Sequence, residues 1–162
     1  MSKVSICIPA YKQVNSLVRL LDSIYIQSYE DYEIIISDDT SDDSIKECVE
    51  RYICKFKNKI KYKKNHIALG SPENWNEAMR NCNSEYIKIM HHDDWFIESK
   101  SLSVLVSAFD RNENLNFVFG NSNDIDINEL NVINTHDKKH KWFSEICNYL
   151  TLKRRICILI YA

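Results

Sequence analysis

The sequence predicts an α/β domain in which a mostly parallel β-sheet carries helices on both faces. Short runs of β-branched residues alternate along the chain with segments whose apolar residues recur at helical spacing. This alternation is typical of parallel sheets joined by right-handed crossovers. The 162 residues are enough to bury a sizeable core, and only two glycines and two prolines occur, so no flexible linker is expected.

The first half of the chain contains the clearest strands. Lys3 to Ile8 and Tyr32 to Ser37 are almost continuously apolar, which predicts strands buried on both faces. Apolar residues at helical spacing over 14–25 and 45–52 predict a helix after each strand. Lys59 to Lys63 alternates between charged and apolar residues, and this predicts a half-exposed strand.

The second half continues the alternation. Ser71-Pro72-Glu73 predicts a helix start, with Ser71 as the N-cap, Pro72 at the first helical position and an acid in the first turn. The remaining elements are expected as a strand over 86–90, a helix over 99–109, a strand over 116–119, a hairpin over 123–132 that turns near 128–131, and a helix over 142–150.

Composition excludes several classes of protein. The net charge is −2, whereas binding to nucleic acid needs a clear basic excess. The basic segment from Lys55 to Lys64 is interpreted as a solvated edge strand whose lysines block aggregation. No pair among the six cysteines has Cys-x-x-Cys spacing, so we expect free thiols in a reducing, cytoplasmic compartment.

Membrane and export signals are not expected. The N-terminus runs directly into the first strand, with no signal peptide before it. A bilayer span needs about 20 apolar residues. The longest apolar run, Ile156 to Ala162, is shorter and is interpreted as a tail.

Polar residues follow three of the predicted strands. The first strand leads into Pro9-Ala10-Tyr11, the second into Asp38-Asp39, and the strand over 86–90 into His91-His92-Asp93-Asp94. Open parallel sheets bind ligands at the carboxyl ends of their strands. Two acidic pairs at this edge repel each other unless a cation or a hydrogen-bond donor lies between them. Mg²⁺ or Mn²⁺ with a phosphate-bearing ligand meets this need, because both ions prefer carboxylate and phosphate oxygens.

The phosphates of that ligand must be bound by a group other than a glycine-rich loop. Neither the dinucleotide fingerprint Gly-x-Gly-x-x-Gly nor the P-loop pattern occurs in the chain. We therefore expect the metal to hold the phosphates. A tyrosine ring, such as that of Tyr11, suits the flat face of a nucleotide base.

These motifs resemble family 2 glycosyltransferases. The family typically shows a strand that ends in Pro-x-Tyr, a helix that ends in Ser-Ile-x-x-Gln, and a strand that ends in Asp-Asp-Gly-Ser-x-Asp. The corresponding residues here are Pro9 to Tyr11, Ser23 to Gln27, and Asp38 to Asp43. Asn74, Ala78, Glu85-Tyr86-Ile87 and Asp93-Asp94 resemble the approach to the family's Asp-x-Asp motif. The resemblance covers roughly the first 120 residues.

The resemblance implies the GT-A fold, which is Rossmann-like, and a nucleotide diphosphate sugar as donor. It implies that Tyr11 lies against the base, that Asp39 accepts a hydrogen bond from the uracil N3–H, and that Asn74 contacts the nucleotide. Asp93 would bind the metal with help from Asp94, and His91 stands where the first aspartate of the motif is usual. The nucleotide-binding residues implied in this way are Pro9, Ala10, Tyr11, Asp38, Asp39, Asn74 and Asp93, and the metal ligands are Asp93 and Asp94.

The leading hypothesis is thus a transferase that moves a sugar, with inversion, from a UDP-sugar to a saccharide or lipid-linked acceptor. The resemblance suggests polysaccharide synthesis in the cytoplasm, at the inner membrane face, and allows peripheral association with the membrane. We expect the nucleotide-sugar-binding domain over 1–135, a truncated start of the acceptor-side region over 136–162, and the general base beyond residue 162.

Two alternatives stay open at this point. One is a nucleotide-sugar-binding remnant without turnover, which a missing acceptor half would produce. The other is a metallophosphohydrolase built on His91 to Asp94. That reaction would need further His or Asp clusters at other strand ends, and only Asp38-Asp39 is found.

Overall fold

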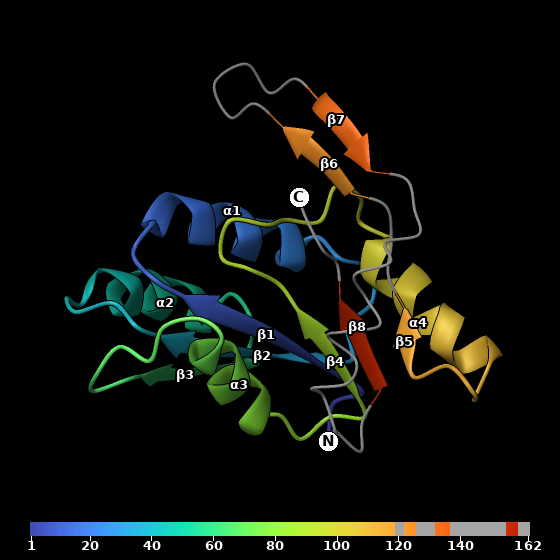
Figure 1. The fold of residues 1–162 in the computed structure, drawn as a ribbon, viewed down its shortest axis with the longest axis horizontal. Coiled ribbons are helices and arrows are strands. Elements are labelled where there is room, and N and C mark those ends of the chain that lie inside the picture. Colours follow the sequence, from blue (N-terminus) through green and yellow to red (C-terminus); the bar gives the residue numbers. More distant parts are fainter. Residues whose placement is uncertain (119–121, 126–131, 137–154, 159–162) are drawn as a thin grey trace.

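The structure is a computed structural model that describes residues 1–118, 122–125, 132–136 and 155–158. Parallel strands β3, β2, β1, β4, β8 and β5 form one sheet in that order, and β6 and β7 form an antiparallel pair (Figure 1). The elements are β1 (Val4–Ala10), α1 (Val14–Tyr25), β2 (Tyr32–Asp38), α2 (Ser44–Ile53), β3 (Ile60–Lys64), α3 (Glu73–Arg80), β4 (Tyr86–Ile89), α4 (Ser101–Arg111), β5 (Phe117–Val118), β6 (Ser122–Ile125), β7 (Val132–His136) and β8 (Arg155–Ile158). The predicted α/β class with a mostly parallel sheet is confirmed.

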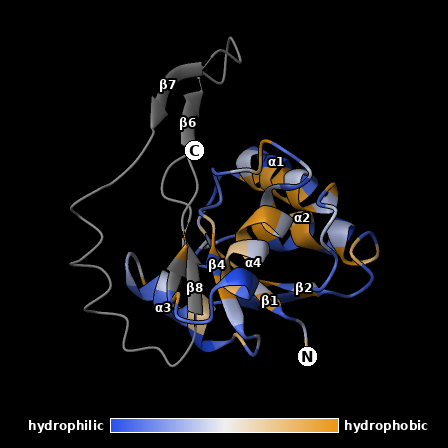
Figure 2. Ribbon diagram, turned by 90° about the vertical axis from the view of Figure 1, so that its right-hand side faces the viewer, coloured by the Kyte–Doolittle hydropathy of each residue, from blue (hydrophilic) through white to orange (hydrophobic). Residues whose placement is uncertain are grey.

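The two faces of the sheet have different covers. Side chains alternate across a strand, so Ile6 and Ile8 of β1 join a large core with α1, α2 and α4, whereas Cys7 joins a smaller core with Ala78 and Met79 of α3. Hydrophobic residues gather where α1, α2 and α4 lie over the sheet (Figure 2). The smaller core fixes α3 across the other face, beside β1 and β2.

Strand register brings the carboxyl ends of the central strands together. Ala10 at the end of β1 pairs with Asp38 at the end of β2, and Asp38 pairs in turn with Lys64 at the end of β3. On the other side of β1, Cys7 pairs with Ile89, the last residue of β4. The segments after these four strands therefore share one edge of the sheet.

The start of α3 differs from the prediction. The helix begins at Glu73, Pro72 occupies the N-cap position, and no side chain caps the helix. The Gly70 carbonyl accepts the hydrogen bond from the Asn74 N–H, and the Pro72 carbonyl accepts one from the Trp75 N–H. Backbone carbonyls of the preceding turn thus take the role that we assigned to Ser71.

The interpretation of Ile156 to Ala162 as a tail is wrong for its described part. Arg155–Ile158 forms β8, a strand that pairs with β4 on one side and with β5 on the other. This strand lies beyond the expected boundary at residue 135, and it nevertheless belongs to the main sheet. The expected hairpin is confirmed by the antiparallel pairing of β6 with β7. Its turn near 128–131 and the helix expected over 142–150 lie outside the described residues.

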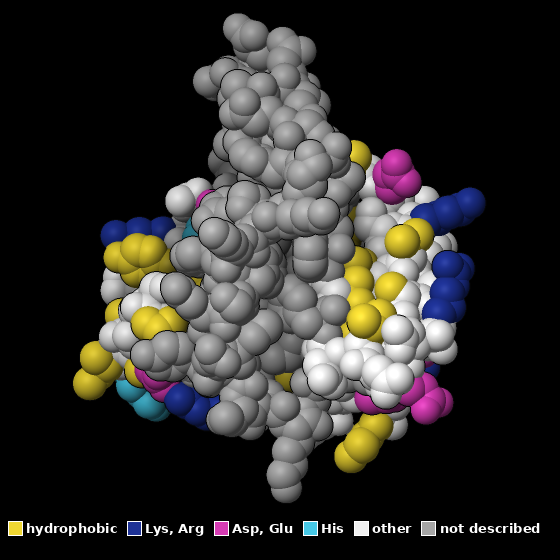
Figure 3. Space-filling view, turned by 45° about the vertical axis from the view of Figure 1, so that its right-hand side comes forward, with side chains coloured by type: hydrophobic (Ala, Val, Ile, Leu, Met, Phe, Trp, Pro, Cys, Tyr) yellow, Lys and Arg dark blue, Asp and Glu magenta, His cyan; other side chains and the backbone are white. Residues whose placement is uncertain are grey.

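The lysine-rich segment from Lys55 to Lys64 includes an edge strand, as predicted. β3 is the first strand of the sheet, and its residues are alternately half-buried and exposed. Several of its lysines pair with acids: Lys61 with Glu33, Lys63 with Glu77, and Lys64 with Asp43. On the face drawn in Figure 3, basic side chains lie among acidic and hydrophobic ones. None of the helices that the structure describes has the length and hydrophobicity needed to cross a membrane.

Candidate nucleotide-sugar site

The Asp38 side chain is completely buried at the end of β2. Its Oδ1 accepts a hydrogen bond from the Thr40 N–H at 2.8 Å, and its Oδ2 accepts one from the Tyr62 hydroxyl at 2.7 Å. Burial and the neighbouring Asp38 carboxylate raise the pKa of Tyr62, which keeps this hydroxyl protonated as a donor. Asp38 therefore fixes the turn after β2 from the inside.

Thr40 connects that turn to the turn after β1. Its hydroxyl accepts a hydrogen bond from the Lys12 N–H at 2.7 Å, and Thr40 itself is 1% exposed. Lys12 and Gln13 both have positive φ angles, 56° and 42°, which residues other than glycine seldom adopt. The bond to Thr40 helps to hold this unusual backbone. Tyr11 lies just before it and is 46% exposed at the sheet edge.

The Asp39 carboxylate is held by a loop that follows β3. Its Oδ1 accepts a hydrogen bond from Asn65 Nδ2 at 2.8 Å, and its Oδ2 accepts two, from the N–H groups of Leu69 at 3.0 Å and Gly70 at 2.8 Å. Asp39 keeps 6% of its surface exposed. Gly70 has a φ of 71°, a left-handed conformation that glycine adopts without a steric cost.

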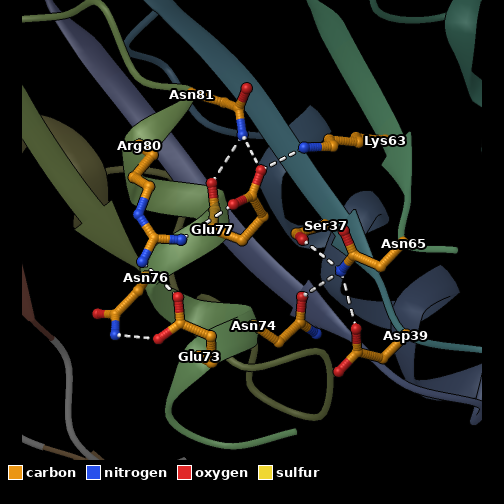
Figure 4. Close-up of polar contacts among 10 residues, drawn as sticks. All are labelled: Ser37, Asp39, Lys63, Asn65, Glu73, Asn74, Asn76, Glu77, Arg80 and Asn81. Carbon is orange, nitrogen blue, oxygen red and sulfur yellow. Dashed lines mark hydrogen bonds and ion pairs between the residues drawn. The ribbon is translucent and has the colours of Figure 1, made fainter. Parts of the chain in front are cut away.

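Asn74 joins this group from α3. Its Nδ2 donates to the Ala10 carbonyl at 3.3 Å, and its Oδ1 accepts from Asn65 Nδ2 at 3.2 Å. Asn65 Nδ2 also lies 3.0 Å from Ser37 Oγ, so one amide links β2, α3 and Asp39 (Figure 4).

An ion-pair network holds the outer face of α3 against β3 (Figure 4). Glu77 pairs with Lys63 of β3 and with Arg80 of its own helix. Hydrogen bonds from Lys63, Asn81 and Arg80 lower the pKa of Glu77 to about 2. The helix that carries Asn74 is thereby fixed from both sides, by this network and by the smaller core.

The residues after β4 form a tight turn. The Asp94 N–H donates to the His91 carbonyl at 3.1 Å, and the Asp94 Oδ2 accepts from the His91 N–H at 3.2 Å. Burial raises the pKa of Asp94, an effect that His91 partly offsets. Asp93, at the tip of the turn, is exposed and makes no hydrogen bond or ion pair within the part of the chain that the structure describes.

The histidines of this turn are placed differently from each other. The His91 ring packs edge-on against Trp75, with ring centroids 4.3 Å apart, and so connects the turn to α3. His92 Nε2 is buried without a hydrogen-bond partner among the described residues. β4 ends at Ile89, so a turn and not a strand places both rings. Within the described ranges, no group of three or more His, Cys, Asp and Glu residues is arranged to hold a metal ion.

Comparison with known proteins decides the family. The model of "Glycosyl transferase family 2" matches residues 5–159. The chain belongs to glycosyl transferase family 2. The expected family membership is therefore confirmed, over a longer stretch than the motifs had indicated.

Named relatives of this family 2 chain are glycosyltransferases. A Campylobacter jejuni protein named GalNAc(5)-diNAcBac-PP-undecaprenol beta-1,3-glucosyltransferase is 33% identical over 122 residues, which are 75% of this chain and 38% of the relative. A poly(ribitol-phosphate) beta-glucosyltransferase of Bacillus spizizenii is 31% identical over 145 residues, 88% of this chain and 21% of that protein. An uncharacterized glycosyltransferase of Rickettsia felis is 33% identical over 130 residues, 79% of this chain and 20% of the relative. The chain thus spans between 20% and 38% of the length of these three relatives.

Solved structures show that the fold is GT-A, as expected. Staphylococcus aureus TarS 1–349 in complex with UDP-GlcNAc matches with a TM-score of 0.61 and 24% identity, covering 72% of this chain and 34% of TarS 1–349. The mannosyltransferase PcManGT of Pyrobaculum calidifontis, in complex with GDP-Man and Mn²⁺, matches with a TM-score of 0.64 and 20% identity. The match covers 76% of this chain and 35% of the PcManGT chain.

The predicted site residues of this family 2 domain fall into two groups. In the first group, hydrogen bonds to the Ala10 carbonyl join Asp39 and Asn74, and Pro9 and Asp38 are buried at the ends of β1 and β2. Asp93 and Asp94 form a second group in the turn after β4. Among the described contacts, the His91–Trp75 packing connects the two groups.

Sequence reasoning missed Asn65, the Leu69–Gly70 amides and the Thr40 hydroxyl. A signal for two of these was present. Asn65 directly follows the last residue of β3, so it lies at the same sheet edge, and Gly70 is one of only two glycines in the chain. The Thr40 hydroxyl gave no signal, because its partner Lys12 is 28 residues away.

Proposed function

We propose that this domain binds the donor of a glycosyl transfer, a nucleotide diphosphate sugar with UDP as the nucleotide. In the whole protein, the sugar passes to a hydroxyl of a saccharide or lipid-linked acceptor with inversion, in the synthesis of a cell-surface polysaccharide. The observation that carries the proposal is the placement of Asp39 and Asp93. They follow β2 and β4, the two neighbours of β1, at one sheet edge.

The Asp39 group offers the base a recognition point. The carboxylate is fixed by three hydrogen bonds at the carboxyl end of β2, so it is preorganised to accept a base N–H. Tyr11 stands exposed after β1 and supplies a flat ring for the base. We assign Pro9, Ala10, Asp38 and Asn74 to the same nucleotide site, where their buried contacts hold its shape.

The turn after β4 fits a divalent cation. Mg²⁺ is commonly held by one or two carboxylates, substrate phosphates and water. Asp93 is exposed and without an internal partner in the described part of the chain, so it meets the first requirement. We assign Asp93 as the carboxylate that would hold Mg²⁺ or Mn²⁺, with Asp94 fixing the turn and completing the metal surroundings. When bound, the ion would neutralise charge that develops on the departing nucleotide diphosphate.

Two relatives support the acceptor class, since their names contain an undecaprenol-linked saccharide and a poly(ribitol-phosphate). Direct displacement needs a base that takes the proton of the acceptor hydroxyl. We assign no residue of the described part to this role. We include in the proposal the expected location of the protein, which is the cytoplasmic side of a membrane, with peripheral association of the protein with that membrane.

The test is a calorimetric titration of UDP into the chain, with Mn²⁺ or with a chelator. We expect binding that weakens at least tenfold when the metal is removed, because the phosphates then lose their cation. Asp93→Asn should bind UDP almost equally weakly with and without Mn²⁺, since a neutral amide is a much poorer ligand for the ion than a carboxylate.

Asp31→Asn is the matched control, because Asp31 is exposed and precedes β2 at the opposite edge of the sheet. This variant should retain the full metal effect. UDP binding that is unaffected by chelation would contradict the metal assignment, and no UDP binding under either condition would contradict the proposed function.

A further inference from the structure

Two cysteine thiols meet in the smaller core, on the face of the sheet that α3 covers. Cys7 belongs to the strand β1, and Cys82 follows the C-cap residue of α3, Asn81. Their Sγ atoms are 2.9 Å apart, although the two residues are 75 positions apart in the chain. A disulfide bond joins its sulfurs at about 2.05 Å, so these two atoms need to approach by only about 0.9 Å to be at bonding distance.

The two thiols differ in how an oxidant can reach them. Cys7 is fully buried in a strand that pairs with β2 on one side and with β4 on the other. Burial raises the pKa of the Cys7 thiol well above its usual range, so this thiol stays protonated. Cys82 is also buried, but it lies between the exposed residues Asn81 and Asn83 in the connection from α3 to β4. Helix ends open locally at a lower free-energy cost than core strands, so an oxidant reaches Cys82 first.

We propose that a peroxide oxidises Cys7 and Cys82 to an intrachain disulfide, and that this bond locks the end of α3 onto β1. First, the Cys82 thiolate attacks one oxygen of hydrogen peroxide, so that an S–O bond forms and the O–O bond breaks. The hydroxide that leaves takes up the proton that Cys82 lost. The Cys7 sulfur then attacks the sulfur of this sulfenic acid, the S–O bond breaks, and the second hydroxide takes the Cys7 proton. Two thiols thus lose two electrons and two protons, and the peroxide is reduced to two waters.

The disulfide acts on a helix that belongs to the proposed donor site. α3 carries Asn74, whose Nδ2 donates to the Ala10 carbonyl of β1 at 3.3 Å. The new bond joins the same strand to the other end of this helix, so that end no longer separates from the sheet. A dithiol reductant restores both thiols by exchange. The inference concerns the chain itself and does not depend on nucleotide binding.

The experiment treats the native chain with hydrogen peroxide, blocks the remaining thiols with N-ethylmaleimide in urea, and maps tryptic peptides by mass spectrometry. Cleavage after lysine and arginine places Cys7 in the peptide from Val4 to Lys12. Cys82 falls in the peptide from Asn81 to Lys88. We expect these two peptides to form the main disulfide-linked pair and to separate in dithiothreitol. Cys54 is exposed and is the internal control for the oxidant. If Cys54 is oxidised while the two peptides stay separate, the inference is overturned.

Unfolding and two variants test whether the fold selects this pair. In urea, the yield of the linked peptides should fall at least about tenfold, because the unfolded chain no longer holds the two sulfurs together. Cys7→Ala removes the second thiol, so Cys82 should stop at the sulfenic acid, which dimedone traps. Cys48→Ala is the matched control, because Cys48 is equally buried but belongs to the larger core, and it should leave the cross-link intact. An equal yield in urea, or loss of the cross-link in Cys48→Ala, would contradict selection by the fold.

Hydrogen exchange measures the lock itself. In the oxidised wild type, the backbone amides of α3 should exchange about tenfold more slowly than in the reduced protein, because the cross-link suppresses local opening. Peroxide should produce no such slowing in Cys7→Ala. Equal exchange of α3 in the oxidised and reduced wild type would show that the disulfide forms without locking the helix, and the inference would fail in that part.

Discussion

At the scale of single residues, buried carboxylates hold the site in shape. Asp38 is completely buried, and the hydroxyl of Tyr62 supplies one of its two hydrogen bonds. A buried carboxylate oxygen without a donor bears the full cost of its lost hydration. The contact between Tyr62 and Asp38 should therefore contribute to stability more than a similar contact at the surface.

Tyr62→Phe should lower the free energy of unfolding by about 1–3 kcal/mol, because a charged buried acceptor loses its donor. Tyr52→Phe is the matched control. The Tyr52 hydroxyl also donates to an aspartate, Asp22, but that side chain is 51% exposed, so the cost should stay below about 1 kcal/mol. Urea unfolding followed by circular dichroism measures both values. Equal losses would show that the burial of Asp38 does not set the strength of the contact.

At the scale of elements, β8 completes the sheet from far along the chain. Ile156 pairs with Ile87 of β4 and with Phe117 of β5, so the strand has neighbours on both sides. A proline within such a strand removes the N–H that the ladder needs. A free tail has no ladder to lose, so proline substitution distinguishes the two interpretations of this segment.

Ile156→Pro should lower the free energy of unfolding by about 3 kcal/mol. Ile156→Val keeps the N–H and the branched Cβ, and should cost at most about 1.5 kcal/mol. Urea unfolding of the two variants beside the wild type gives the comparison. If proline and valine both changed stability by less than about 0.5 kcal/mol, the value usual for surface positions, residues 155–158 would not act as a central strand.

At the scale of the whole molecule, the proposed donor binding should be linked to folding stability. The proposed site combines the turns after β1, β2 and β4 with the loop after β3, so the unfolded chain cannot reproduce it. A ligand that binds only the folded state at a concentration of 100 times its dissociation constant stabilises that state by about 2.7 kcal/mol.

UDP with Mn²⁺ at that concentration should raise the Tm by about 5–10 °C for a domain of this size. Scanning calorimetry measures the shift. Asp39→Asn, tested at the same ligand concentration, should show a much smaller rise because the amide replaces one acceptor oxygen with a donor and removes the negative charge. A full shift in this variant would place the nucleotide away from Asp39.

The sequence by itself determined the parallel α/β class, the order of the first eight elements and the strand ends that carry acidic residues. These features depend on hydrophobic periodicity and on motifs that are local in the chain, as in Ile34 to Ile36 followed by Asp38 and Asp39. Family membership followed from the same motifs, because they recur in order at fixed spacing.

The tertiary structure alone decided which groups surround each carboxylate. Asp38 and Asp39 are adjacent in sequence. Asp38 accepts hydrogen bonds from Thr40 and Tyr62, whereas Asp39 accepts hydrogen bonds from the loop after β3. Their partners lie between 2 and 31 residues away, and only folding brings them into contact. The same reason explains β8. Ile156 to Ile158 resemble part of an apolar tail in isolation, and their strand character comes from pairing with β4 and β5.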